Sequence, residues 1–130
     1  MKLAIDTNIY CDFAEGNTQV VDVLSEFGEN LYLPSVVLGE LSYGFLKGGR
    51  RERNEAKLNN IIQTLGIMVV DVTQSVASKY GLIYLSLIRK GKKIPINDVW
   101  IAACCMEIGG TLLTRDRHFS HVDQIDTIIL

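Results

Sequence analysis

The chain opens with residues 1–10, MKLAIDTNIY, in which a short apolar run meets an acidic residue. Leu3 to Ile5 predicts a buried β-strand, because apolar residues follow one another without a polar break. Asp6 comes directly after this run, at the point where the strand ends. A carboxylate at that point either caps the following helix or takes part in a reaction, and the rest of the chain has to decide between these roles.

Strand-like and helix-like segments alternate along the rest of the chain. Helical spacing of apolar residues predicts helices over 18–27 and 75–89. Apolar runs rich in β-branched residues predict strands at 3–5, 31–33, 67–72, 111–114 and 127–130. This order predicts an α/β fold, a parallel sheet with helices on both faces. Ligands bind such sheets beyond the carboxyl ends of the strands, so we expect the chemistry at that edge.

Length and composition narrow the class of protein. With 130 residues, 48% of them hydrophobic, we expect one domain over residues 1–130 whose core needs no disulfide. The three cysteines are odd in number, which favours free thiols in a reducing compartment. A net charge of −2 excludes a molecule-wide basic field for nucleic acid. Neither a signal peptide nor an apolar run of about 18 residues is visible, so we expect a soluble, cytoplasmic protein without a membrane segment.

Three aspartates lie where local structure alone would account for them. Asp6 can cap a helix, and Asp116 follows the strand expected at 111–114 as a turn residue. Asp98 lies in the first turn of the helix that Pro95 introduces, where the helix dipole favours a carboxylate by about 0.3–1 kcal/mol. None of the three requires a catalytic role by itself.

Glu40 has no such local explanation. It follows Val36 by four residues and Val37 by three, so a helix here places the carboxylate on an apolar face. Burying an unpaired carboxylate costs several kcal/mol, so Glu40 has to be paired, protonated or bound to a cation. We expect it to be the most buried of the four acids.

All four acids can meet in one pocket. Asp6 and Asp116 end two strands, while Glu40 and Asp98 lie on helices that start at the same sheet edge. Two carboxylates about 4 Å apart repel by about 4 kcal/mol at an effective dielectric near 20, so the cluster predicts bound protons or a divalent cation. Ligands that are all oxygen favour Mg²⁺ or Mn²⁺ over zinc.

The order and spacing of these motifs resemble those of PIN-domain ribonucleases, and specifically of VapC-type toxins of toxin-antitoxin pairs. The resemblance covers the whole chain. It rests on Asp6-Thr7-Asn8, on Pro34-Ser35 leading to Glu40-Leu41, on Asn97-Asp98 followed by Ile101-Ala102-Ala103, and on Thr114, Asp116 and Phe119 of TRDRHF.

This resemblance implies a three-layer α/β/α sandwich around a mostly parallel central sheet of about five strands. It implies a site whose catalytic and metal-binding residues are Asp6, Glu40, Asp98 and Asp116, with Thr7, Asn8 and Thr114 supporting them. It also implies a Mg²⁺- or Mn²⁺-dependent endoribonuclease that hydrolyses RNA with a metal-activated water, forms a homodimer and is inhibited by a small cognate antitoxin. The RNA sequence, the number of metal ions and the role of Glu40 as ligand or general base stay open.

Positive charge for an RNA strand has several candidate sources. Arg115 and Arg117 flank Asp116, and we expect them to contact phosphate. The basic clusters at 50–53 and 89–93 are typical of solvated helix ends, because Lys and Arg are favoured near helix C-termini. His118 and His121 are expected to be surface residues near a turn.

Two other functions stay open at this point. A response-regulator receiver domain has a similar length and an acidic Mg²⁺ pocket at the same sheet edge, and Asp71 lies near the end of the third strand. The chain lacks the paired acid after the first strand and the lysine after the fifth that a receiver needs. The second alternative is a catalytically silent PIN fold that only binds partners, with its carboxylates kept as helix caps.

Overall fold

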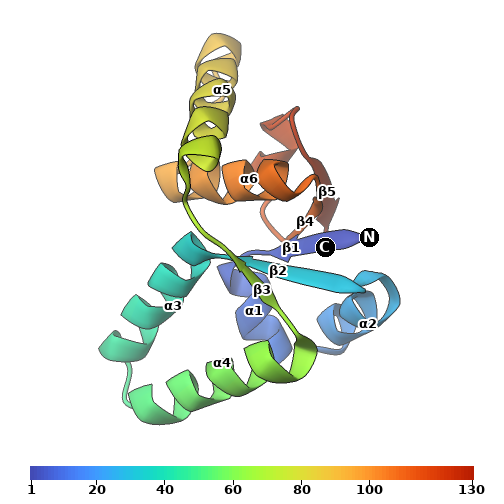
Figure 1. Ribbon diagram of the computed structural model, residues 1–130, viewed down its shortest axis with the longest axis vertical. Helices are drawn as coiled ribbons and strands as arrows, with labels where there is room; N and C mark the ends of the chain where they lie inside the picture. Colours follow the sequence, from blue (N-terminus) through green and yellow to red (C-terminus); the bar gives the residue numbers. More distant parts are fainter.

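The computed structural model describes residues 1–130 and has a sheet of five parallel strands at its centre (Figure 1). The strands are β1 (Lys2–Ile5), β2 (Asn30–Pro34), β3 (Met68–Val70), β4 (Thr111–Thr114) and β5 (Asp126–Ile129). Their spatial order is β3-β2-β1-β4-β5, and every neighbouring pair is parallel. Ala4 of β1 therefore lies between Tyr32 of β2 and Leu112 of β4. The expected sheet is confirmed, with all of its strands parallel.

Six helices cover the two faces of this sheet. One face carries α1 (Thr7–Ala14), α2 (Thr18–Phe27), α3 (Ser35–Lys47) and α4 (Arg51–Leu65), and the other carries α5 (Gln74–Lys90) and α6 (Ile96–Ile108) (Figure 1). The chain runs outward from β1 to β3 and then crosses back to β4, so right-handed connections place the later helices on the opposite face. A short 3₁₀ helix, η1 (Arg117–His121), joins β4 to β5. The three-layer α/β/α sandwich is thus confirmed.

The core is one continuous cluster of 28 buried hydrophobic residues. Helix α6 contributes most densely, because Ala102, Ala103, Cys104 and Cys105 are all fully buried against the sheet and α5. Phe119 is also fully buried and anchors η1 to the core. None of the helices has the length and the apolar character needed to cross a bilayer.

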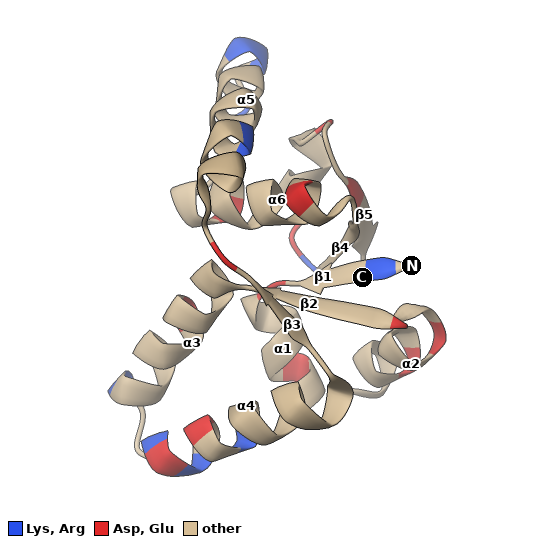
Figure 2. Cartoon of the chain, in the orientation of Figure 1, with Lys and Arg blue, Asp and Glu red and all other residues tan.

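Two features of the fold differ from the expectation. Helix α4 was not predicted, because Leu58 is its single buried residue and its apolar stripe is confined to its second half, where Ile61 and Ile62 also pack on the core. The basic cluster at 50–53 therefore lies at the start of α4, and its expected place at a helix C-terminus is wrong. The cluster at 89–93 does lie at the end of α5, as expected. Figure 2 shows these two basic segments at opposite ends of the molecule.

Candidate active site

A polar cavity of about 490 Å³ opens beyond the carboxyl ends of the central strands, and the structure brings all four acids to it. Hereafter this cavity is called the acidic cleft. Its lining consists of Asp6, Thr7, Asn8, Glu40, Pro95, Ile96, Asn97, Asp98, Ile101 and Asp116. The acids reach it from the ends of β1 and β4 and from helices α3 and α6, so the convergence inferred from topology is present.

Asp6 is the most buried acid of the cleft, with 6% of its surface exposed. It caps α1, since its Oδ1 accepts a hydrogen bond from the Ile9 backbone N–H at 3.0 Å. Its Oδ2 accepts a second bond from Thr114 Oγ1 at 2.5 Å. Burial raises the pKa of Asp6; the two hydrogen bonds oppose that shift, while the charges of Asp98 and Asp116 add to it. The carboxylate is thus both a helix cap and a wall of the cleft.

Thr114 ties the two strand ends together. Its side chain is fully buried, and its hydroxyl donates to Asp6 while accepting the backbone N–H of Asp116 at 3.0 Å. One side chain therefore fixes the rotamer of Asp6 and the direction of the chain at Asp116. These contacts are compatible with the supporting role that the family resemblance implied for Thr114.

His118 stands between two of the acids, contrary to the expectation of a surface residue without a role. Its Nε2 lies 2.7 Å from Oδ2 of Asp98 and 3.4 Å from Oδ2 of Asp116. One ligand atom from each of these three residues lies within 4.8 Å of the others. Burial raises the pKa of Asp98, and the hydrogen bond and charge of His118 pull it back, with Asp116 and Glu40 opposing them. The sequence feature that could have indicated this role is that His118 follows Asp116 by two residues. The 3₁₀ helix η1 then turns His118 back over the cleft.

Glu40 lines the cleft but is not the most buried acid, so that prediction is wrong. Its carboxylate is half-exposed, and its Oε1 accepts a hydrogen bond from Thr7 Oγ1 at 2.8 Å. The core contacts of α3 are made by Val37 and Leu41 instead. Glu40 looks into the cleft because α3 follows β2 directly at the carboxyl edge of the sheet, so this side of the helix borders the cleft.

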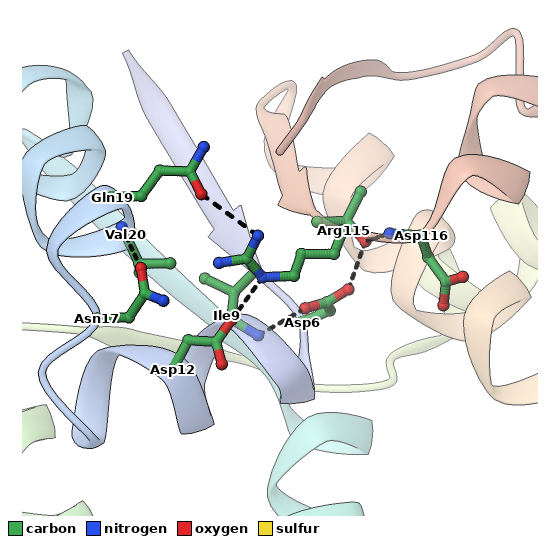
Figure 3. A network of polar contacts seen from close by, with 9 residues as sticks. Asp6, Ile9, Asp12, Asn17, Gln19, Val20, Arg115 and Asp116 are labelled. Atoms are coloured by element: carbon green, nitrogen blue, oxygen red, sulfur yellow. Dashed lines mark hydrogen bonds and ion pairs between the residues drawn. The ribbon is translucent and has the colours of Figure 1, made fainter.

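Arg115 and Arg117 do not behave as a pair. Arg115 Nε donates to Asp12 Oδ2 at 2.6 Å, and its guanidinium also reaches Gln19. Figure 3 shows this side chain pointing toward α1 and α2 while Asp116 points the other way. This corrects the expectation of a phosphate contact for Arg115, because its guanidinium is held away from the cleft. Arg117 is exposed on η1.

Two further residues complete the account of the site. Asn97 lines the cleft beside Asp98 and was not assigned a role from the sequence, where it looked like a helix-start residue. Asp71 is exposed and is not among the residues that line the cleft. The residue required for the receiver alternative therefore lies outside the acidic pocket.

Comparison with known proteins agrees with this geometry. The PIN domain family matches residues 3–125. A protein named ribonuclease VapC2 from Haemophilus influenzae is 30% identical over 131 residues, covering 98% of this chain and 96% of the relative. A protein named tRNA(fMet)-specific endonuclease VapC from Shigella flexneri is also 30% identical, over the same shares of both chains.

Among solved structures, the chain is similar to one described as DNA-bound VapBC from Salmonella typhimurium. The TM-score is 0.87 at 25% identity, covering 98% of this chain and 97% of the other. A second similar structure, FitAcB from Neisseria gonorrhoeae, has a TM-score of 0.82 at 27% identity, covering 97% of this chain and 96% of that one. The likeness extends over essentially the whole chain in both cases.

Proposed function

The chain belongs to the PIN-domain family, and from this membership and its acidic cleft we propose that it is a VapC-type endoribonuclease. It is a hydrolase that cuts RNA phosphodiester bonds, and residues 1–130 form its single nuclease domain. The observation that carries the proposal is the convergence of Asp6, Glu40, Asp98 and Asp116 on one cavity. Uncharged helix caps would serve any structural purpose of these acids at a lower cost in free energy.

The residues of the cleft fit a hard divalent cation. Their donors are carboxylate oxygens, which suit Mg²⁺ or Mn²⁺. Burial raises the pKa of Asp6 and of Asp98, and the neighbouring acids add to both shifts, so a cation in the cleft would favour the charged carboxylates. We assign Asp6, Asp98 and Asp116 as ligands, with Glu40 as a ligand or as the base that faces them. When bound, the ion supplies Lewis-acid stabilisation of phosphate charge and lowers the pKa of a coordinated water.

The protein groups around the cleft position the reaction. Thr114 and the Ile9 amide fix both oxygens of Asp6, and His118 fixes one oxygen of Asp98, so these carboxylates are preorganised. Thr7 holds one oxygen of Glu40, which leaves the other free to orient a water or accept its proton. Attack by water in line with the scissile bond leaves a 5′-phosphate and a 3′-hydroxyl. Asn8, exposed in the lining of the cleft, and Arg117, exposed on η1 next to Asp116, are candidates for contacting the RNA backbone.

The partners follow from the relatives. The similar Salmonella structure is of a VapBC assembly, so we propose that a small cognate antitoxin binds this chain and inhibits it. We propose in addition that the active form is a homodimer. Its RNA substrate places its activity in the cytoplasm. Because one relative is named for cutting tRNA(fMet), transfer RNA is the first substrate to test.

A single-turnover cleavage assay tests the proposal. Purified protein is mixed with transfer RNA and Mn²⁺, and the wild type is compared with Asp98→Asn and with the matched control Asp71→Asn. We expect a loss of about 100-fold or more for Asp98→Asn, the size seen when one group that stabilises transition-state charge is removed, and none for Asp71→Asn. RNA with a 2′-deoxy nucleotide at the cleavage site should still be cut, because water is the nucleophile.

The outcomes separate the candidate functions. Equal cleavage by the wild type and Asp98→Asn would remove the acidic cleft from the mechanism. Absence of cleavage with retained antitoxin binding would favour the catalytically silent PIN module. Products that end in a cyclic phosphate would refute attack by water.

A further inference from the structure

A second cavity, of about 570 Å³, adjoins the acidic cleft along helix α3. It is lined by Thr7, Val36, Gly39, Glu40, Tyr43 and Asn97. Thr7, Glu40 and Asn97 line both cavities, so the two form one continuous depression. A strand bound at the acidic cleft can therefore extend into this second cavity, called here the α3 subsite.

Tyr43 is the outer wall of the α3 subsite. Tyr43 is 66% exposed, and its ring does not pack against the hydrophobic core. The fold thus gains little from this ring, and its place in the lining of a cavity that adjoins the acidic cleft leaves it free to contact a ligand bound there. Lys47 Nζ lies over one face of the ring, 5.8 Å from its centroid, which leaves the opposite face for a ligand.

Gly39 lines the same cavity as Tyr43 and leaves open space there. A Cβ added at Gly39 would meet nothing within 4 Å, so no packing contact inside the protein requires a glycine there. Gly44 on the same helix is equally open but does not line the cavity, which makes it a matched control. At Gly39 the missing side chain leaves room in the cavity that Tyr43 also lines.

The spacing along α3 suits consecutive nucleotides. Glu40, Tyr43 and Lys47 follow one another at intervals of three and four residues and therefore lie on one stripe of the helix. Neighbours on such a stripe have Cβ atoms about 5–6 Å apart. If the scissile phosphate of an RNA strand lies at Glu40, the adjoining base comes next to the Tyr43 ring. The next phosphate then comes next to Lys47.

We propose that Tyr43 is a stacking platform for the base next to the scissile phosphate of single-stranded RNA, with Lys47 binding the following phosphate. This inference rests on the proposed function and adds a base-binding subsite to it. Stacking fits here because every base has a flat face and an aromatic ring accepts it without reading its sequence. The positive charge of Lys47 offsets the repulsion that the acidic cleft exerts on the strand.

The test is a double-mutant cycle between the protein and the RNA. Oligonucleotides with one abasic nucleotide at successive positions around the cleavage site are cut by the wild type, Tyr43→Ala and Tyr43→Phe. We expect Tyr43→Ala to lower kcat/KM by roughly 5- to 150-fold, mainly through KM, and Tyr43→Phe to retain activity. The abasic substitution next to the cleaved bond should cost the wild type a similar factor and cost Tyr43→Ala nothing further.

Control variants and binding measurements separate the loss of the subsite from misfolding and from loss of catalysis. Gly39→Leu fills the subsite and should weaken cleavage, whereas Gly44→Leu should not, and thermal unfolding reports whether each variant is folded. Binding of the same oligonucleotides is measured with variants that also carry Asp98→Asn. The coupling between Tyr43 and the base is then obtained from dissociation constants, without cleavage. Lys47→Ala should reduce the salt dependence of this binding, whereas the exposed control Lys92→Ala should not.

Several results would overturn the inference. One is equal activity of Tyr43→Ala and the wild type on every RNA. Another is a Tyr43→Ala variant that cuts RNA normally but escapes inhibition by the antitoxin, which would assign Tyr43 to a protein interface. Independent, multiplicative losses in the cycle would also refute stacking. If the wild type cleaves no RNA but the binding cycle still couples, the proposed function fails while the subsite stands.

Discussion

Replacing Asp6 by asparagine should stabilise the protein in the absence of divalent metal. Asp6 is the most buried charge of the acidic cleft, and its pKa is raised because burial outweighs its two hydrogen bonds. The native state therefore holds this proton more tightly than the unfolded chain, whose aspartates have a pKa of about 3.9. The contribution of Asp6 to the free energy of unfolding is greatest below the pKa of the unfolded chain and is lost as pH rises through the native pKa. The loss is about 1.4 kcal/mol for each unit by which the native pKa exceeds the unfolded one.

The size of the effect follows from what asparagine keeps and loses. Its carbonyl oxygen still accepts the Ile9 N–H, so the cap of α1 survives. The bond from Thr114 loses its charge assistance or its partner, which costs about 1 kcal/mol. Asparagine also removes the buried charge, whose desolvation is the largest cause of the raised pKa, and with it the smaller repulsion by Asp98 and Asp116. We expect a net gain of about 1–2 kcal/mol, a rise in Tm of several degrees for a domain of this size.

Thermal unfolding followed by circular dichroism checks this expectation. The wild type, Asp6→Asn and the exposed control Asp71→Asn are compared with EDTA at pH 4 and pH 7.5, and with Mn²⁺ at pH 7.5. The advantage of Asp6→Asn should be present at pH 7.5 and shrink at pH 4, where Asp6 of the wild type takes up its proton. Mn²⁺ at 100 times its Kd should stabilise the wild type by about 2.7 kcal/mol and Asp6→Asn by much less. An asparagine variant less stable than the wild type at pH 7.5 in EDTA would refute the reasoning.

Three further substitutions test other parts of the site and core. Thr114→Val removes the donor to Asp6 and should lower the free energy of unfolding at pH 7.5 by about 1–3 kcal/mol in urea titrations, with a smaller loss at pH 4. His118→Ala leaves Asp98 without its partner and should weaken Mn²⁺ binding by about 10- to 100-fold in calorimetry; unchanged or tighter binding would contradict a supporting role. Phe119→Ala empties a fully buried site beneath η1 and should cost about 3–5 kcal/mol in the same urea titrations.

Much of the fold was predictable because local signals and the global pattern agree. Helix α2 has the bounds predicted from apolar spacing, and α6 starts after Pro95 and ends at Gly109, whose positive φ closes it. Strand order in an alternating α/β chain is constrained by right-handed connections, so the edge that collects the acids could be inferred as well. Helix α4 escaped because its first half is polar and its apolar stripe, which packs on the core through Leu58, Ile61 and Ile62, spans only its second half.

The parts of the site that were not predicted depend on side-chain direction. Arg115 and Asp116 are adjacent in sequence, yet one side chain turns to Asp12 and the other to the cleft. His118 reaches the acids because η1 folds back, a tight turn whose path follows from the burial of Phe119. The burial of Glu40 was overestimated because an apolar helix face does not show where the sheet beneath it ends.

The choice between helix cap and reactive group, which Asp6 raised from the start, has no single answer in this fold. The carboxyl edge of a parallel sheet is also where the following helices begin, so their unpaired amides surround any acid placed there. Asp6 uses one oxygen for the α1 amide and the other for Thr114 at the cleft. Asp98 caps no amide but lies in the first turn of α6, where the helix dipole favours its charge. Helix starts thus partly offset the cost of gathering charges that repel each other. A local cap signal is therefore no evidence against catalysis here, and only the joint position of the four acids distinguishes a nuclease site from ordinary capping.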